Sequence, residues 1–450
     1  MLHGRTSRFL WILVAPIAIA ALAFAACGDD EDGGDGVTPA DLETPTVEEI
    51  GAVSVLGIWG TGTVELEAFE AVVAAWEARG GDMDFVGTRN IDSILTIEAE
   101  GGNLPDVSLP AALATFKALI ESGDAVPLEE CLDLADLEAA YGASLDDLTI
   151  DGTVYGFFFK SSSKGAGIWY SPKQFAASGY EVPETFDELI ALSDQMVADG
   201  NTPWSVAEFA NGSSGFPGSD FIQEAVIHEW GPDVYDQWVA HEIPYNDDRI
   251  KASWQKYGQI LFTDGYTLQT PDAIVSTSFL EGNFPLFESD PPAALMQYMP
   301  SFNAGVIPGQ FPDLVPEEDF DFFEFPTIDP DYADAVTGDG NIAMIFNSDP
   351  ATCSFIEQIS TATAQAVWAA RGGYTSVNKE IPLDSYPGVL DRRAAEQLAG
   401  PDALFRFDAG DGMPAGVGGS DGAEFLGIVQ YITGGDLDAN LKDIDDAFPE

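Results

Sequence analysis

Hydrophobic positions follow two different periods in the first part of the chain. Residues 52–59 (AVSVLGIW) form an apolar run of strand length that ends at a tryptophan. In the next stretch, 64–79, apolar side chains recur at helical spacing and so largely share one face: Val64, Leu66, Phe69, Val72, Val73 and Trp76. Two glycines follow directly. We therefore predict a buried strand followed by an amphipathic helix.

This pairing of strand and helix repeats along the chain. The runs 83–88 and 106–109 have the apolar character and length of strands, and helical patterns follow them at 91–100 and 111–123. Regular alternation of this kind is typical of a parallel sheet with helices packed on it. The fold class that the pattern predicts is α/β.

Further along the chain the alternation is less regular. Thr185 and Glu188 have the spacing of a capping box and predict the start of a helix. Residues 319–329 are expected to hold a strand and then a crossing marked by a proline, and 341–347 another buried strand, followed by a helix with Pro350 in its first turn. Behind the N-terminal segment we find no second long apolar run, so we expect this part of the protein to be soluble.

The segment 1–26 has the character of a secretory signal, because Arg5 and Arg8 precede a short apolar run that ends in small residues. Cys27 follows directly, as in a bacterial lipobox, where the enzyme cuts before the cysteine and its thiol is lipidated. The alternative is an ordinary signal peptide, or one uncleaved helix, with an incidental cysteine. Residues 27–50 are rich in Gly, Asp, Glu, Thr and Pro and predict an acidic, flexible tether.

The charge balance excludes one class of partner. The chain holds 76 Asp and Glu against 17 Lys and Arg, a net charge of −59, and such a surface repels nucleic acid. The acids are spread along the whole chain. They suit a solvated, aggregation-resistant exported protein, or one adapted to salty surroundings where screening relieves self-repulsion. Hydrophobic residues make up 46%, which is enough for large cores.

The three cysteines and three histidines also limit the chemistry. With Cys27 lipidated, Cys131 and Cys353 are left, and an exported protein can keep a disulfide between two such residues. Two separate buried thiols are the alternative. Because the sequence has no cluster of Cys and His, we predict no metal site.

No short motif indicates catalysis. Residues 418–422 (GGSDG) match the Gly-x-Ser-x-Gly pattern of serine hydrolases, but the last histidine, His241, precedes them. Residues 60–62 (GTG) resemble half of a dinucleotide fingerprint, and Glu65 stands where the third glycine would be. We therefore predict no cofactor and no enzyme activity. With 76 acids, a carboxylate pair for glycoside cleavage can always be drawn, so a secreted glycoside hydrolase is the alternative from another class.

Longer stretches carry a family resemblance. They are SVLGIWGTGTVELEAFEAVVAAWE, GGNLPDVSLP, DGTVYGFFFKSSSKGAGIWYSPKQFAASGYEVPETFDELIALSDQMVADGNTPW, GPDVYDQWVAHEIPYND and WAARGGYTSVNKEI. Together they resemble the family 1 extracellular solute-binding proteins of carbohydrate ABC transporters, and most closely the α-glucoside-binding subgroup. The likeness covers nearly all of residues 51–450.

The resemblance implies a two-lobe periplasmic-binding-protein (flytrap) fold that closes on a sugar. Each lobe would be discontinuous in sequence: residues 51–158 with 338–378 in lobe one, and 160–328 with 379–450 in lobe two. The implied function is capture of an α-glucoside such as maltose, trehalose or sucrose. A monomer, anchored by lipid to the outer face of the cytoplasmic membrane, would deliver the sugar to the permease subunits of an ABC importer.

The resemblance also implies the ligand contacts. Sugar rings have a weakly apolar face and a rim of hydroxyls, which aromatic and hydrogen-bonding side chains satisfy. The implied contacts are Trp59, Thr61, Glu65, Arg89 and Asp92 in lobe one, Lys160 and Asp339 at the chain crossings, Trp204, Asp220, Phe279 and Phe302 in lobe two, and Arg371 and Phe425 near the end of the chain. Core packing for the tryptophans, an Arg89–Asp92 pair and a helix-capping role for Arg371 are the structural alternatives.

Two further functions are open at this point. Side-chain details decide the ligand, so another carbohydrate or a polyol is the alternative within binding. A surface adhesion or structural lipoprotein is the alternative without a small ligand.

Overall fold

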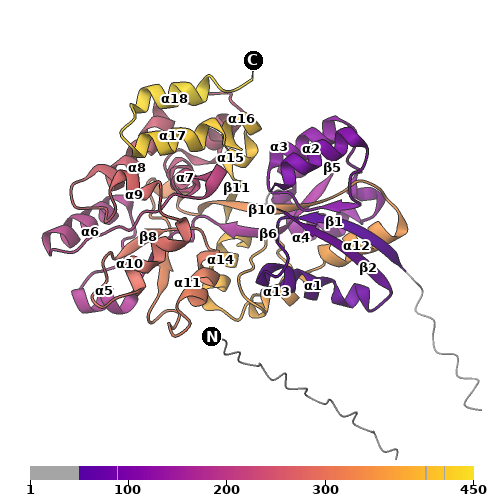
Figure 1. Ribbon diagram of the computed structural model, residues 1–450, viewed down its shortest axis with the longest axis horizontal. Coiled ribbons are helices and arrows are strands. Elements are labelled where there is room, and N and C mark those ends of the chain that lie inside the picture. The colour runs from indigo at the N-terminus through magenta and orange to yellow at the C-terminus, as the bar shows by residue number, and fades with distance from the viewer. Residues whose placement is uncertain (1–49, 89, 401–402, 420, 450) are drawn as a thin grey trace, which may run out of the picture. The chain divides into compact units, whose positions relative to one another are not determined.

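The computed structural model describes residues 50–88, 90–400, 403–419 and 421–449, which belong to one compact unit (Figure 1). The predicted signal segment 1–26, Cys27, the tether up to residue 49, and Arg89 lie outside the described residues. Within the described ranges, every helix is too short or too polar to cross a membrane.

A six-stranded sheet forms the centre of the first half of the fold, with strand order β11-β10-β3-β1-β2 and β6 paired to β10. Its strands are β1 (Gly51–Gly57), β2 (Gly81–Gly87), β3 (Val107–Ser108), β6 (Gly156–Ser163), β10 (Ala335–Ile345) and β11 (Leu404–Phe407). β1 runs parallel to both β2 and β3. The predicted α/β class is therefore confirmed, but the sheet is mixed, because β10 runs antiparallel to both β3 and β6.

Helices cover this sheet. They are α1 (Val64–Glu77), α2 (Ile91–Gly101), α3 (Leu113–Glu121), α4 (Leu134–Tyr141), α12 (Pro350–Ser360) and α13 (Ala362–Ala369), with the short hairpin β4 (Thr149–Ile150) and β5 (Thr153–Val154) beside them. The helix α1 starts at Thr63, whose side chain accepts a hydrogen bond from the backbone N–H of Leu66. Its predicted buried face is confirmed except for Val64, the first helical residue, which is 77% exposed.

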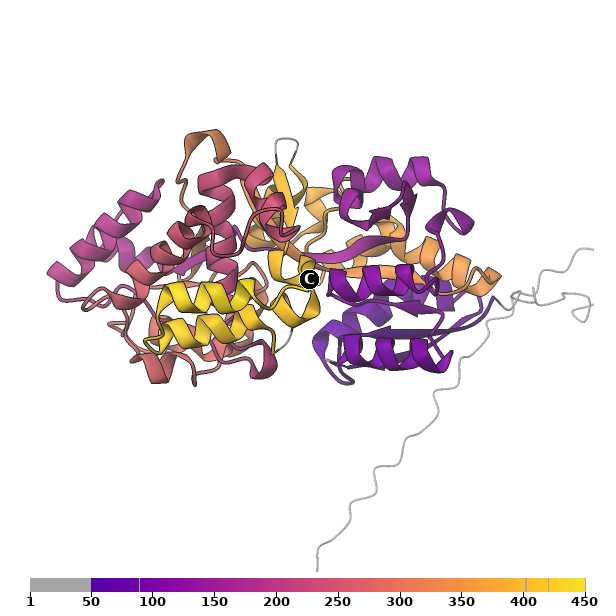
Figure 2. The ribbon, with the colours of Figure 1, turned by 90° about the horizontal axis from the view of Figure 1, so that it is seen from above.

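A second, three-stranded sheet contains β7 (Ile168–Tyr170) between β8 (Met296–Tyr298) and β9 (Asp321–Phe323), all antiparallel. Its helices are α5 (Pro172–Ser178), α6 (Phe186–Ala198), α7 (Phe216–Val239), α8 (Asp248–Phe262), α9 (Pro271–Ile274), α10 (Phe284–Phe287), α11 (Asn303–Gln310), α15 (Ala409–Gly412), α16 (Ala415–Gly418), α17 (Ala423–Ile432) and α18 (Leu437–Asp445). The predicted capping box of Thr185 and Glu188 is present at the start of α6. The last two helices, yellow in Figure 2, pack on each other, and α17 also contacts α7.

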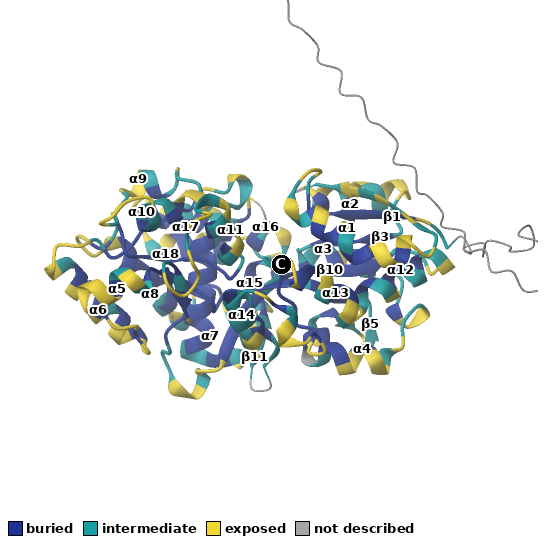
Figure 3. Ribbon diagram, turned by 90° about the horizontal axis from the view of Figure 1, so that it is seen from below, coloured by how far each residue is buried: buried dark blue, intermediate teal, exposed yellow. Residues whose placement is uncertain are grey.

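The two halves have separate hydrophobic cores. We call lobe one the residues around the first core (50–159 and 342–381), and lobe two the residues around the second and its small satellite (166–335 and 409–449). Figure 3 shows the strands β3 and β10 buried, while helices such as α6 turn exposed residues outward.

Three strands connect the lobes. β6 and β10 form a long antiparallel pair that lies between the lobes in Figure 1, and β11 runs parallel to the start of β10. Phe407 of β11 still packs with the first core, as do Ala395 and Leu398 of α14 (Val389–Ala399). Leu390 and Ala394 of the same helix pack with the satellite core of lobe two, so residues 389–407 contact both lobes. The expected division at 378/379 stays a prediction.

Of the two arrangements that the sequence left open for the remaining cysteines, the structure shows the disulfide. A disulfide joins Cys131 to Cys353 across 222 residues of sequence, with their Cα atoms 4.7 Å apart. It links the segment after α3 to the first turn of α12. Both ends lie in lobe one.

Candidate functional site

The crossing strand β6 carries Lys160 to the boundary between the lobes. Lys160 is opposite Asn341 of β10, next to an irregularity in the pairing of the two strands. Its ammonium nitrogen Nζ lies 5.9 Å from the centre of the Trp368 ring, at the end of α13 in lobe one. An ammonium over an indole face is a favourable cation–π arrangement.

A pocket opens beside Lys160, between elements of both lobes. It is lined by Lys160, Ser161, Ser162, Ser301, Phe302, Gly373, Tyr374, Thr375 and Asp391. β6 supplies the first three residues, and Ser301 and Phe302 precede α11 of lobe two. The turn after α13 supplies the next three, and Asp391 lies in the first turn of α14. Two expected contacts, Lys160 and Phe302, are therefore brought together.

The pocket holds a hydrogen-bond donor, an acceptor and an aromatic ring. Burial raises the pKa of Asp391 to about 6, against the opposing effects of the Gly373 N–H and the Lys160 charge. The hydroxyl of Ser161, a buried residue, has no hydrogen-bond partner among the described residues. A charged donor, a carboxyl group, a spare hydroxyl and an aromatic edge suit an uncharged, hydroxyl-rich ligand with one apolar face.

Aromatic rings of lobe two continue from Phe302. The Phe279 ring centre lies 6.2 Å from that of Phe302, and Phe216 lies 4.9 Å from Phe279. All three are partly exposed. The expected contact Phe279 is thus adjacent to the pocket, and Phe216, which the sequence analysis did not select, extends the apolar surface.

The structure places Trp59 in the core of lobe one, which corrects its expected role as a ligand contact. The residue is 3% exposed and packs against Phe69, Phe85 and Trp368, with ring centres 4.9–6.2 Å away. Its face is covered and has no room for a sugar. Trp59 instead packs against Trp368, whose ring lies under the ammonium group of Lys160.

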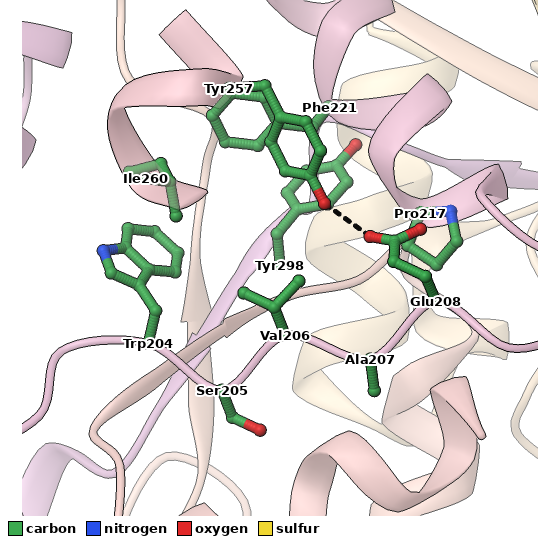
Figure 4. A pocket seen from close by; sticks show the side chains of 10 residues that line it. All are labelled: Trp204, Ser205, Val206, Ala207, Glu208, Pro217, Phe221, Tyr257, Ile260 and Tyr298. Carbon is green, nitrogen blue, oxygen red and sulfur yellow. Dashed lines mark hydrogen bonds between the residues drawn. The ribbon is translucent and has the colours of Figure 1, made fainter. Parts of the chain in front are cut away.

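Trp204 is also a core residue. It is 1% exposed, and its indole N–H donates to the Ser193 hydroxyl at 3.1 Å. It lines a second pocket inside lobe two, drawn in Figure 4, whose walls are mostly apolar and aromatic. In that view the Tyr257 hydroxyl points at the Glu208 carboxyl group, 2.5 Å away. The indole is therefore satisfied within its own lobe.

Asp220 faces a buried lysine and not the pocket. Asp220 is 4% exposed and its Oδ1 lies 2.5 Å from Nζ of Lys164, which also pairs with Asp408. Burial raises the pKa of Asp220 to about 7, against the lowering effect of Lys164. Asp220 therefore belongs to a buried ion-pair cluster and is absent from the pocket lining, and its role as a ligand contact stays a prediction.

Lys164 interacts with all three strands that connect the lobes. It follows β6 directly, its backbone N–H donates to Thr337 O of β10 at 3.0 Å, and Asp408 follows β11. Burial lowers its pKa, but the charges of Asp220 and Asp339 outweigh this and the net shift is upward. Asp339, another expected contact, lies opposite Ser162 on β10 at the edge of this cluster.

The other expected contacts lie away from the pocket lining. Thr61 is exposed in the turn after β1, and Glu65 is partly buried in the first turn of α1. Asp92 is in the first turn of α2, where burial raises its pKa although Thr115 hydrogen-bonds it. Arg371 is exposed just before the pocket turn, and Phe425 is partly buried on α17.

Sequence reasoning missed several residues of this region, including Lys164, Tyr374 and Asp391. Lys164 stands four positions after Lys160 in one run, KSSSK, so the pattern offered two cations with no means to rank them. Tyr374 lies within the quoted stretch RGGYTSVNK. For Asp391 no local signal separates it from the many other acids. Within the described ranges, no group of His, Cys, Asp and Glu side chains could hold a metal ion.

Comparison with known proteins shows the family. Residues 90–388 match the family described as bacterial extracellular solute-binding protein. The osmoprotective compounds-binding protein GgtB of Synechocystis sp. is 32% identical over 401 residues, which cover 88% of this chain and 92% of that protein. The alpha-glucosides-binding periplasmic protein AglE of Rhizobium meliloti is 32% identical over 392 residues, covering 84% and 83%.

A solved structure agrees in fold. The chitin oligosaccharide binding protein superposes with a TM-score of 0.73 at 18% identity, over 88% of this chain and 97% of its own. Such similarity supports the two-lobe architecture. With a match to the family over most of the chain and relatives aligned along nearly their whole length, this chain belongs to the bacterial extracellular solute-binding proteins and is an exported binding protein, not an enzyme.

Proposed function

We propose that the protein captures a sugar outside the cytoplasmic membrane and passes it to the permease of an ABC importer, and that the sugar is an α-glucoside such as maltose, trehalose or sucrose. The pocket between the lobes carries this proposal, because Lys160, Asp391 and Phe302 offer a donor, an acceptor and a ring in one place. The similarity to a protein named for binding alpha-glucosides supports the ligand class.

Capture follows from the two-lobe architecture. A ligand that contacts both lobes favours the arrangement in which they meet around it, and the crossing strands are the elements about which they would move. Pocket residues from β6, α14, the segment before α11 and the turn after α13 would all touch one ligand. The same closed form would be what a permease recognises.

A second ligand class is another carbohydrate or a polyol. The similarity to a protein named for osmoprotective compounds favours including it. The pocket's mixture of one cation, one carboxyl group and several hydroxyls recognises hydroxyl groups in general.

The test is thermal unfolding of the purified protein against a panel of α-glucosides, other sugars and polyols, at low and high salt. Only a solute that binds the folded state raises the unfolding midpoint. A rise with an α-glucoside, followed by calorimetric titration and no product formed, is the expected result. A rise with a polyol alone would move the ligand to the second class, and no shift with any solute would refute sugar capture.

The lipid anchor at Cys27 is part of the proposal. We expect the exported protein to carry a lipid on this residue and to fractionate with membranes. A form in which segment 1–26 is replaced by an ordinary cleavable secretory signal, and Cys27 by serine, should then appear in the soluble extracytoplasmic fraction. Equal distribution of both forms would show that the cysteine is incidental.

A further inference from the structure

Two backbone segments without side chains meet at the edge of the pocket. Gly305 lies on α11 of lobe two, and Gly372 and Gly373 form the turn after α13 of lobe one. A Cβ atom placed on Gly305 would stand 3.7 Å from the Cα of Gly373, which is ordinary van der Waals contact. The gap between the helix α11 and the turn is therefore about wide enough for one methyl group.

The turn is fixed from two other directions. Gly372 and Gly373 have φ values of +83° and +66°, which glycine adopts without the strain other residues would suffer. The Gly373 N–H donates to the Asp391 carboxyl group at the start of α14. The turn therefore cannot easily move aside if a larger group comes toward it from α11.

The place where α11 approaches the turn also borders the pocket. Gly373 lines the pocket, and so does Phe302, which lies three residues before Gly305 and accepts the Gly305 N–H through its backbone oxygen. A change in the distance between α11 and the turn would therefore change the space between Phe302 and Gly373. Only one methyl group fits at contact distance between them, so a larger side chain at Gly305 that extends toward the turn pushes α11 and the turn apart.

We propose that the missing side chain at Gly305 lets lobe two approach lobe one closely at Gly373, and so determines how tightly the pocket encloses its solute. This inference rests on the proposed function for its consequence in binding. Its geometric part, the close approach of α11 to the turn, can be tested without a ligand.

The chain offers a matched control on the same helix. Gly309 is also exposed, lies one helical turn after Gly305, and has no atom within 4 Å of a Cβ placed on it. Leucine favours a helix over glycine at both positions, by up to about 1 kcal/mol. Gly305→Leu and Gly309→Leu should therefore both fold, and they differ in what the new side chain meets.

Calorimetric titration with the solute that binds best measures the effect on affinity. We expect Gly305→Leu to bind at least tenfold more weakly than the unchanged protein, and Gly309→Leu to stay within twofold. Gly305→Ala should also stay within about threefold, because one methyl group fits at contact distance. Equal affinities for both leucine variants would overturn the proposal.

Amide hydrogen exchange of residues 371–375, without any solute, gives the second readout. We expect exchange there to be faster in Gly305→Leu than in Gly309→Leu, because the larger side chain displaces the turn and disturbs its hydrogen bond to Asp391. Unchanged exchange would overturn the proposal even if affinity fell. If no solute bound the unchanged protein, the proposed function would fail, and exchange alone would decide whether α11 and the turn approach each other this closely.

Discussion

The ammonium group of Lys160 lies over the ring of Trp368, 5.9 Å from its centre, where a crossing strand meets the aromatic core of lobe one. Trp368 packs in turn against Trp59 and Tyr374, with ring centres 4.9 and 5.3 Å away. The charged group of the pocket therefore rests on a buried aromatic base. Such a base limits the positions that the ammonium can take and prepares it to donate to a ligand hydroxyl.

Replacing Lys160 with methionine keeps an unbranched side chain of nearly the same length and removes its charge. We expect solute affinity to fall by about tenfold to a hundredfold, the loss of one hydrogen bond to a charged group. Lys173→Met is the control, because the Lys173 side chain is 68% exposed and lies outside the pocket lining. Titration calorimetry compares the two variants. An equal loss in both, or none in either, would contradict a binding role for Lys160.

Replacing Lys164 with methionine should instead damage folding. The change leaves Asp220 and Asp408 without the buried cation that now pairs with both. Breaking one side of a buried ion pair typically costs about 3–5 kcal/mol of unfolding free energy. Denaturant unfolding measures it. Lys442→Met, which breaks an exposed pair with Asp446, should change stability by less than about 0.5 kcal/mol. A similar small change for Lys164→Met would show that the cluster contributes little.

Glu208 predicts a pH dependence of stability. Burial raises its pKa to about 8 from 4.5, although the Tyr257 hydroxyl and the Gly218 N–H oppose the shift. The folded protein therefore keeps a proton that the unfolded chain releases above pH 4.5. The unfolding free energy that this proton contributes is complete below pH 4.5. It falls by roughly 1.4 kcal/mol per pH unit as pH rises, and it is lost near pH 8.

The Glu208→Gln variant removes this titration. Its unfolding free energy should decrease less steeply between pH 5 and 8 than that of the unchanged protein. The two slopes should differ by roughly 1.4 kcal/mol per pH unit, the effect of one proton. Glu100→Gln, at an exposed position of α2, is the control and should leave the slope unchanged. Denaturant melts at several pH values give the comparison. Parallel curves for all three proteins would mean that Glu208 is ionised in the folded state.

Removing the disulfide should lower stability without affecting binding. Cys131 and Cys353 enclose a loop of more than two hundred residues, and a cross-link of this kind contributes about 2–5 kcal/mol. Both ends lie in lobe one, so the pocket walls of lobe two are not attached to it. The Cys131→Ser/Cys353→Ser double variant should unfold at a lower temperature and bind solute within twofold of the unchanged protein. A large loss of affinity would show that the bridge also positions the pocket.

Local patterns predicted much of the framework. The alternation of apolar runs and helical faces placed β1, α1, β2 and α2, because these elements depend on neighbours in sequence. The capping box at Thr185 and Glu188 is likewise a local arrangement and is present. The run 341–347 was expected as an ordinary strand, whereas it is the end of the longer β10, because pairing with β6 and β11 extends it through the crossing.

The site was harder to predict, because aromatic and acidic residues serve several purposes. Trp59 and Trp204 follow patterns that suit either ligand contact or core packing, and burial on all sides made both of them core residues. Asp220 is one of many acids, and only its approach to Lys164 from another element placed it in a buried ion pair. Lys160 and Phe302, expected from resemblance, do line the pocket.

The sequence by itself determined the α/β class, the family likeness and the absence of a recognisable catalytic motif, since these depend on periodicity, composition and long continuous stretches. The tertiary structure decided which of two nearby lysines is buried and which lines the pocket, and it brought Asp391 to the Gly372–Gly373 turn and Gly305 to Gly373. Those contacts join residues far apart in the chain. They exist because three crossing strands hold two independently packed cores against each other, which no local pattern of residues encodes.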